Sequence, residues 1–408
     1  MSRRGWIAGA SFVALSAITA ASPVAHAVDY EGELGASARW FVQSTDDPRQ
    51  SVQDFSVSGE LRLNHRFDDR RQSFDLAITG RIDSDDGERS QWDIGTLTWR
   101  YQWRHAAVSV GLDKVFWGTT ESLHLVDVIN QTNRVDELDG DSKLGQPMLR
   151  LSFTPGRHEL DLFVLPRFRE QRLPGSRGRL RGPLQLIDAN PGFESDKGNQ
   201  HLDLAVRYGS YIGGLSYALS HFSGTARTPL LRLSPSQTPF ELPTLRPLYF
   251  LTDRTGLELS LVTGDWLWKL EALSARDDLQ RYLAAVGGFE LTLPAIAGTS
   301  MDLGLILEYQ YDSRSSDRLL QSVSVANDDL VAGLRIGAND FAGSELLALY
   351  SYDRQSNGRI ASIEASRRFG NNWRGSLEAR FFSGQSDVDA LSVFANEDHW
   401  QLTITRFF

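Results

Sequence analysis

The chain has 408 residues, no cysteine and a formal net charge of −10. Its length fits two or three soluble domains or one large barrel, and a chain of this size needs no disulfide bonds to fold. The acidic balance and the lack of a basic cluster argue against nucleic-acid binding. Beyond residue 27 no apolar run approaches the ~20 residues of a membrane-spanning helix, which excludes a helical membrane protein.

The first 27 residues have the three parts of a secretory signal peptide. Arg3 and Arg4 supply the positive start, an apolar run covers residues 6–20, and residues 25–27 form a small-x-small cleavage site. We therefore expect export across the inner membrane and a single mature domain over residues 28–408.

Apolar and polar residues alternate with a period of two in many segments after the leader. Residues 97–103, 202–208 and 303–311 place Leu, Val, Tyr or Trp at every second position, with mostly polar residues between them. This pattern predicts strands with one apolar and one polar face. In a soluble sandwich the polar face meets water, whereas in a membrane barrel the apolar face meets lipid and the polar face lines the lumen.

The joins between these strands favour the barrel because they alternate between short and long. The short joins are residues 68–72, 102–105, 155–157, 209–213, 264–265, 293–299, 338–343 and 370–372, and the longer ones include 118–145, 171–199, 228–247, 313–328 and 384–398. Short periplasmic turns and long extracellular loops are typical of outer-membrane barrels. The prediction is an all-β transmembrane antiparallel barrel of about 18 strands, with about 16 as the alternative. At this size the lumen is wide enough for an aqueous path.

The last ten residues form an amphipathic strand that ends on an aromatic residue. Trp400, Leu402, Ile404 and Phe408 share one face, and polar residues occupy the other. Such an ending resembles the last strand of bacterial outer-membrane barrels, which their assembly machinery reads. The resemblance implies that these four residues act as the insertion signal.

Residues 110–130 contain a Trp-Gly pair, Trp117 and Gly118, followed by Asp127 and Asn130 in an Asp-x-x-Asn arrangement. This stretch resembles one in poorly characterised porin-like outer-membrane β-barrel proteins of Gram-negative bacteria, with Gln131 in place of an expected proline. Apolar residues share one face of an expected short helix in this loop, at positions 123, 126 and 129. Two alternatives stay open: the loop folds inward and narrows the pore, or it packs on the rim.

Arginines follow the strand at residues 160–164 and are the main candidates for lining the pore. They are Arg167, Arg169, Arg172, Arg177, Arg179 and Arg181. Extended chain would place the last three on one face as a ladder. An opposing acidic wall is expected across the pore or beside them, formed by Glu121, Asp127, Asp136, Glu137 and Asp139. Such a ladder predicts a weak-to-moderate anion preference. The alternative is that the arginines bind lipopolysaccharide phosphates.

His221 and Ser223 form the one pattern that suggests an enzyme. Both share the outward parity of their strand, and the pair resembles the His-x-Ser signature of outer-membrane phospholipase A, with Gly224 in place of the expected Asn. The alternative is an ordinary polar pair at the headgroup level. We expect no metal site and no cofactor, because the histidines are scattered and residues 136–141 lack the full calcium-loop pattern.

These patterns favour a porin-like channel for passive diffusion of small polar or anionic solutes, without enzymatic activity. The alternatives are a phospholipase-type hydrolase using Ser223 and His221, and an envelope-structural barrel that transports nothing. The expected partners are outer-membrane lipids, lipopolysaccharide, the barrel-assembly machinery and the permeant. The sequence leaves the oligomeric state open, with a homo-oligomer as one alternative.

Overall fold

The computed structural model describes residues 28–45, 47–135, 140–181, 191–234, 244–314, 328–384 and 390–408. The predicted leader therefore lies outside the described residues. Within these ranges no helix is long and apolar enough to cross a membrane.

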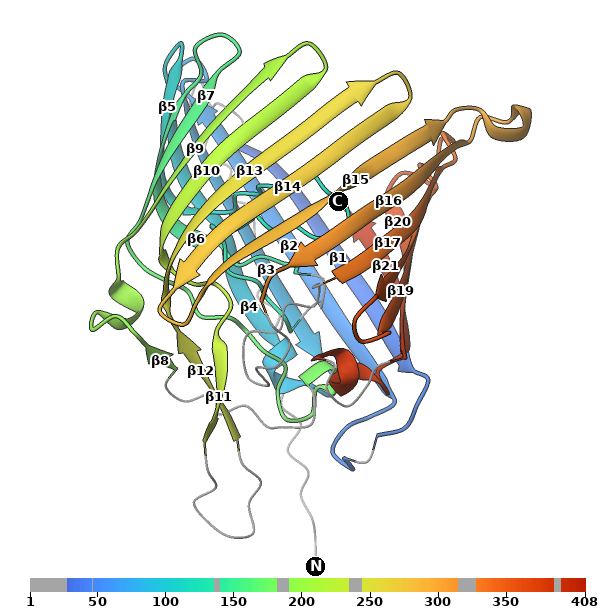
Figure 1. The fold of residues 1–408 in the computed structure, drawn as a ribbon. Helices are drawn as coiled ribbons and strands as arrows, with labels where there is room; N and C mark the ends of the chain where they lie inside the picture. Colours follow the sequence, from blue (N-terminus) through green and yellow to red (C-terminus); the bar gives the residue numbers. More distant parts are fainter. Residues whose placement is uncertain are drawn as a thin grey trace, which may run out of the picture.

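Eighteen antiparallel strands form one closed sheet (Figure 1). They are β1 (Val28–Phe41), β2 (Gln53–Phe67), β3 (Gln72–Asp83), β4 (Gln91–Gln102), β5 (Ala106–Asp113), β6 (Gln146–Phe153), β7 (Glu159–Leu165), β9 (Asp203–Ile212), β10 (Leu215–Thr225), β13 (Leu251–Thr263), β14 (Trp266–Asp277), β15 (Arg281–Leu293), β16 (Asp302–Asp312), β17 (Asp328–Gly337), β18 (Glu345–Asp353), β19 (Arg359–Phe369), β20 (Trp373–Ser383) and β21 (His399–Phe407). The predicted fold class and strand number are confirmed.

The barrel closes where β1 pairs with β21, from Glu33 opposite Phe407 to Phe41 opposite His399. Phe408 extends this seam by exchanging two backbone hydrogen bonds with Gly32, of 2.9 and 3.0 Å. The Phe408 ring lies where a Cβ atom on Gly32 would be. A glycine is therefore needed opposite the terminal aromatic ring.

The two faces of the strands separate as the alternation predicts. Trp400, Leu402 and Ile404 are 39, 43 and 49% exposed on the outside of the barrel, and Phe408 is 58% exposed. Their neighbour Gln401 points inward and is buried against Arg39. The outer surface is thus apolar, as a surface that meets lipid must be.

The tight turns and both described chain ends lie at one rim, and most long connections lie at the other. The strict alternation of short and long joins is wrong at two places, because residues 278–280 and 354–358 make short connections at the long-loop rim. At the first, the Asp277 carboxylate accepts two backbone N–H groups, which closes a tight turn. A small sheet of β8 (Gly192–Phe193), β11 (Leu230–Ser234) and β12 (Thr244–Tyr249) also lies at this rim (Figure 1).

Candidate functional site

The connection between β5 and β6, residues 114–145, folds into the barrel, and we call it the inner loop. Its tip reaches the wall formed by β14 and β16. Counted from β5 around the ring of 18 strands, these are the sixth and the eighth strand. The inner loop therefore crosses the lumen. Of the two alternatives left open by the sequence, the inward fold is confirmed. The expected short helix is absent, because residues 121–130 consist of bends and turns.

Two buried carboxylates on the wall hold the tip of the inner loop. Glu271 on β14 accepts the backbone N–H groups of Thr119 and Thr120 at 2.7 and 3.1 Å. Glu308 on β16 accepts the N–H groups of Glu121 and Ser122 at 2.8 and 2.9 Å. Both carboxylates are at most 1% exposed. Charge-assisted bonds of this kind are the stronger hydrogen bonds in proteins, so the tip is firmly anchored.

Glu121 was expected to face the arginines, and that expectation is wrong. Its carboxylate pairs with Arg335 at 2.6 Å and Lys269 at 3.5 Å on the wall. Glu290 bridges the same two cations at 3.1 and 3.4 Å. Glu121 therefore anchors the inner loop, because two wall cations are closer to it than any arginine of residues 167–181.

The near side of the inner loop packs into an apolar core against β6, β7, β9 and β10. The core consists of Val115, Trp117, Val126, Val128, Ile129, Met148, Phe163, Leu165, Ala205 and Phe222. The last five project inward from strands, where a porin-type lumen is usually polar. Side chains consequently fill the space between the inner loop and these four strands at the level of this core.

The Asp-x-x-Asn arrangement shapes the inner loop. Asn130 accepts the N–H of Val115 at 2.8 Å and donates to the carbonyls of Asp113 and Leu144, both at 2.9 Å. Asp127 is buried, lies 3.0 Å from Lys143 and accepts the N–H of Trp117 at 3.4 Å. Burial raises the pKa of Asp127, although Lys143 acts in the opposite direction.

Asp127 therefore belongs to the loop's interior, and its predicted place in an acidic wall is wrong. Asp136, Glu137 and Asp139, the other expected members of that wall, lie outside the described residues. Gln131, which stands where the resemblance expects proline, is buried and donates to the carbonyl of Arg169 at 3.1 Å.

Three adjoining cavities run along β1–β4 on the far side of the inner loop. The first, of about 950 Å³, opens at the long-loop rim between residues 87–94 and 167–176. The second, of about 230 Å³, shares Gln91, Asp93 and Arg172 with the first. The third, of about 420 Å³, shares Glu60, Thr79 and Lys114 with the second and reaches Asp29 near the tight-turn rim. Their shared lining residues place the three cavities in series along this wall, and we call the series the passage.

A fourth cavity, of about 450 Å³, lies across the inner loop between Gly118 and strands β9, β10 and β13. None of its lining residues belongs to the three cavities of the passage. The inner loop separates it from them.

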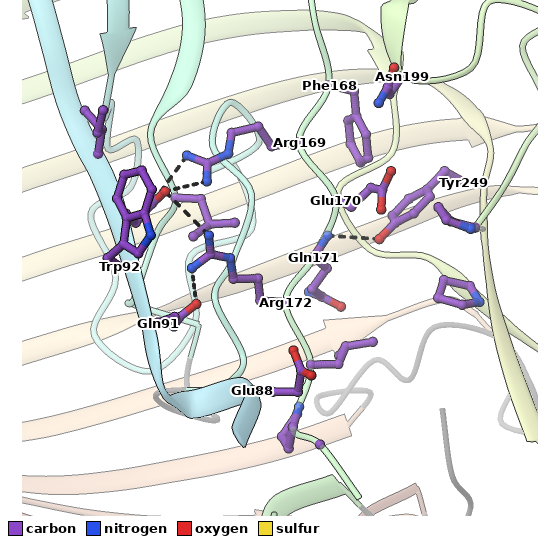
Figure 2. A pocket seen from close by; sticks show the side chains of 18 of the residues that line it. Glu88, Gln91, Trp92, Phe168, Arg169, Glu170, Gln171, Arg172, Asn199 and Tyr249 are labelled. Carbon is purple, nitrogen blue, oxygen red and sulfur yellow. Dashed lines mark hydrogen bonds and ion pairs between the residues drawn. The ribbon is translucent and has the colours of Figure 1, made fainter. Parts of the chain in front are cut away.

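Three of the predicted arginines lie at the mouth of the passage. Arg169 and Arg172 converge on Asp93, at 2.8 and 3.6 Å (Figure 2). Arg172 also hydrogen-bonds Gln91. Arg167 lines the same cavity and is exposed. The mouth is therefore lined by arginines, but a carboxylate compensates two of them.

The other three arginines do not form a ladder. Residues 179–181 make a short 3₁₀ turn instead of extended chain, so the side chains diverge. Each reaches a different carboxylate: Arg177 lies 3.4 Å from Asp85, Arg179 2.8 Å from Glu397 and Arg181 2.7 Å from Asp47. These pairs brace the loops of the rim.

His221 and Ser223 lie exposed on the outer face of β10. His221 Nδ1 lies 2.9 Å from the hydroxyl of Thr255 on the neighbouring strand, a partner that the sequence did not reveal. No hydrogen bond is formed between His221 and Ser223 in the described chain. The geometry thus lacks the contact through which the imidazole would activate the serine. Within the described ranges no three His, Asp, Glu or Cys residues are placed to hold a metal.

The fold is similar to that of solved outer-membrane barrels. OccK3 (OpdO) of Pseudomonas aeruginosa gives a TM-score of 0.52 at 13% identity, covering 93% of this chain and 96% of that one. Wzi of Escherichia coli, an outer membrane protein involved in group 1 capsule assembly and a carbohydrate-binding β-barrel, gives 0.51 at 9% identity, covering 91% and 83%. A mutant of the Rh. blastica porin gives 0.44 at 11% identity, covering 94% and 100%. No protein-family model matches the sequence, and neither does any curated protein. The first two likenesses show an outer-membrane β-barrel fold.

Proposed function

We propose that the protein is a porin-like channel of the bacterial outer membrane, through which small polar or anionic solutes diffuse passively. The observation that carries this proposal is the polar passage along β1–β4, whose three cavities adjoin in series. A barrel of 18 strands is wide enough to leave such a path even when a loop crosses the lumen.

The passage suits hydrated, polar permeants. Charged side chains of both signs line its middle, among them Glu33, Glu60, Arg81 and Lys114. A lining of this kind replaces part of a solute's hydration shell and disfavours apolar permeants. Three arginines and three carboxylates line the mouth, so it admits polar and charged solutes: Arg167, Arg169 and Arg172 with Glu88, Asp93 and Glu170.

Location in the outer membrane belongs to the same proposal. The leader-like residues 1–27 would direct export, and the strand that ends on Phe408 would be read by the barrel-assembly machinery. The apolar outer face would meet lipid and lipopolysaccharide. Membership of the porin-like family with the Trp-Gly and Asp-x-x-Asn stretch is also part of the proposal, supported by the loop-shaping contacts of Asp127 and Asn130.

Single-channel recording of the purified protein in a planar bilayer tests the channel. We expect stepwise ohmic currents. Thr79 projects into the passage where the second and third cavities meet, so Thr79→Trp should lower the conductance several-fold. Ile78→Trp is the matched control, because Ile78 is on the opposite face of the same strand, next to the outward Leu61. A sealed bilayer, or equal conductance of the two variants, would overturn the proposal.

A further inference from the structure

Three residues line the junction between the second and the third cavity, and we call them the waist. Glu60 on β2, Thr79 on β3 and Lys114 at the start of the inner loop line both the second and the third cavity. Glu60 and Thr79 are direct cross-strand partners. The second cavity is the smallest of the three, at about 230 Å³, so a solute inside it lies among the charged groups that line it.

The charges at the mouth are poorly placed to select ions. Asp93 pairs with both Arg169 and Arg172, and Glu88 and Glu170 line the same cavity. Arg167 borders this largest of the three cavities, about 950 Å³. Water and salt screen a charge at the edge of so wide a space, with a Debye length of about 8 Å at physiological ionic strength. Selection by charge therefore requires a group deeper in the passage.

Lys114 meets that requirement. Its side chain is exposed to the passage, and no carboxylate of the described chain lies within the 4.0 Å of an ion pair with its ammonium group. The side chain lies over Gly95, where a Cβ atom would be 3.1 Å from Cε and 3.2 Å from Nζ. Gly95 is skipped in the pairing of β3 with β4, where the register shifts between Ala77 and Ile78. The bulge and the missing side chain thus give Lys114 its place.

The surroundings of Lys114 leave its charge available. Glu60, across the waist, is engaged by Arg62 on the same strand. Glu33 lies directly opposite Glu60 on β1, and Arg81 lines the second cavity beside them. Taken together, the second and third cavities are lined by six carboxylates and five cations, so opposite charges nearly balance, and the lysine faces the β1–β3 wall from the inner loop. The carboxylates are Asp29, Glu31, Glu33, Glu60, Asp75 and Asp93, and the cations are Arg62, Arg81, Lys114, Lys143 and Arg172.

We propose that Lys114 is the specificity-determining residue of the passage and transiently binds small anionic solutes at the waist. The inference rests on the proposed channel function. An ammonium group is a compact point charge on a flexible stem, without the fork with which arginine binds carboxylates. It should favour anions as a class and discriminate little between carboxylate and inorganic anions.

The zero-current potential across a KCl gradient tests this assignment. We expect a wild-type preference for chloride and a fall of about fivefold in the chloride-to-potassium permeability ratio for Lys114→Gln. A unit charge about 4 Å from a chloride ion in water contributes about 1 kcal/mol, or about fivefold, and its repulsion of potassium acts in the same direction, so the expected fall is at least this large. Lys114→Arg should keep the wild-type ratio. Arg167→Gln, the matched loss of one positive charge at the mouth, should change the ratio much less.

The absence of cysteine permits a second readout on one variant. In Lys114→Cys, a thiol reagent that adds a positive group should restore the chloride preference, and one that adds a negative group should favour potassium. Open channels whose ratio is unchanged by Lys114→Gln and by both reagents would overturn the assignment while leaving the channel intact. A wild-type protein that conducts no ions would instead remove the proposed function itself.

Discussion

The two halves of the lumen are built from the same kind of strand and end in opposite states. Along β6–β10 the inward residues include Met148, Phe163 and Phe222, and the inner loop packs onto them in an apolar core, beside a separate cavity of about 450 Å³. Along β1–β4 the inward positions carry Glu33, Glu60 and other polar groups that the loop leaves uncovered. Strand geometry is common to both halves, so the inward side chains decide which one stays open.

This difference explains which wall of the barrel the inner loop packs against. Burying its apolar side gains about 25 cal/mol per Å² of apolar surface, and only the apolar half of the wall offers that gain. The polar wall offers charged groups whose burial would cost free energy unless each found a partner. The loop thus fills one half and reaches past it, to Glu271 and Glu308, for the anchors of its tip.

The seam between β1 and β21 closes the barrel on which both halves depend, so breaking it should abolish the comparison altogether. Phe408→Ser removes the ring that lies over Gly32 and alters the ending expected to be read for insertion. We expect a several-fold loss of folded protein in the outer-membrane fraction, measured by the heat-dependent mobility of the barrel on gels. Phe407→Ser, on the neighbouring residue of β21, is the control and should assemble better. Normal assembly of the Phe408 variant would contradict the role assigned to this residue.

The free energy of unfolding should fall far more when a residue of the apolar core is truncated in the packed half than when a polar residue is truncated in the open half. Phe163 is 1% exposed, and Phe163→Ala should lower the free energy of unfolding by about 3–5 kcal/mol. Ser58→Ala, at the open wall, should change it by less than about 0.5 kcal/mol. Urea titrations of the two variants in the same lipid compare them. Equal losses would mean that the halves are not packed differently.

The barrel could be predicted from the sequence because each strand shows the alternation of apolar and polar residues that lipid on one side and a lumen on the other require. The alternation at Trp400, Leu402 and Ile404 places these residues on the outer face, and this holds for any strand that pairs with theirs. For the inner loop, the sequence predicted the inward fold only as one of two alternatives. A local pattern does not say which wall receives a loop, because the receiving residues are distant in sequence.

The site illustrates the same limit. Glu271 and Glu308 contact residues 119–122, which lie about 150 and 187 positions away in the sequence, and no local pattern pairs residues so far apart. The ladder expected at residues 177–181 failed because those residues turn and meet acids in three other segments. The apolar inward residues Phe163 and Leu165, which break the polar parity of β7, were the available signal of a filled half.

Releasing the tip of the inner loop should let the loop move within the lumen, so that it separates the packed half from the open half less well, without unfolding the barrel. The test is the double variant Glu271→Gln with Glu308→Gln. Each new amide keeps one acceptor oxygen, but its NH₂ group faces the N–H donors of the loop. Each buried group left without a hydrogen-bond partner costs about 1–3 kcal/mol of stability. We expect a larger and more variable single-channel conductance. The control is Glu378→Gln on β20, whose carboxylate accepts from Gln401. Steady wild-type currents in the double variant would show that the packed half alone holds the loop.

The smallest expected effect concerns the outer rim of the open half, where Arg179 and Glu397 are 2.8 Å apart and largely buried. Arg179 also donates to the carbonyls of Gln43 and Asn396, at 3.1 and 2.8 Å, so the contact joins three loops. Burial raises the pKa of Glu397 to about 7, although the arginine acts to lower it.

The sign of the pH dependence follows from that pKa. Between its ordinary value of 4.5 and about 7 the folded protein binds more protons than the unfolded chain, so the stability contributed by Glu397 falls as the pH rises through this window. Glu397→Gln removes the ionisation. The variant should therefore exceed the wild type in free energy of unfolding at pH 8, by on the order of 1 kcal/mol, and match it at pH 5. Urea midpoints at the two pH values measure the difference. If the variant is the less stable protein at pH 8, the ion pair with Arg179 outweighs the cost of burying the charge, and the rim of the open half is held by electrostatics rather than by packing.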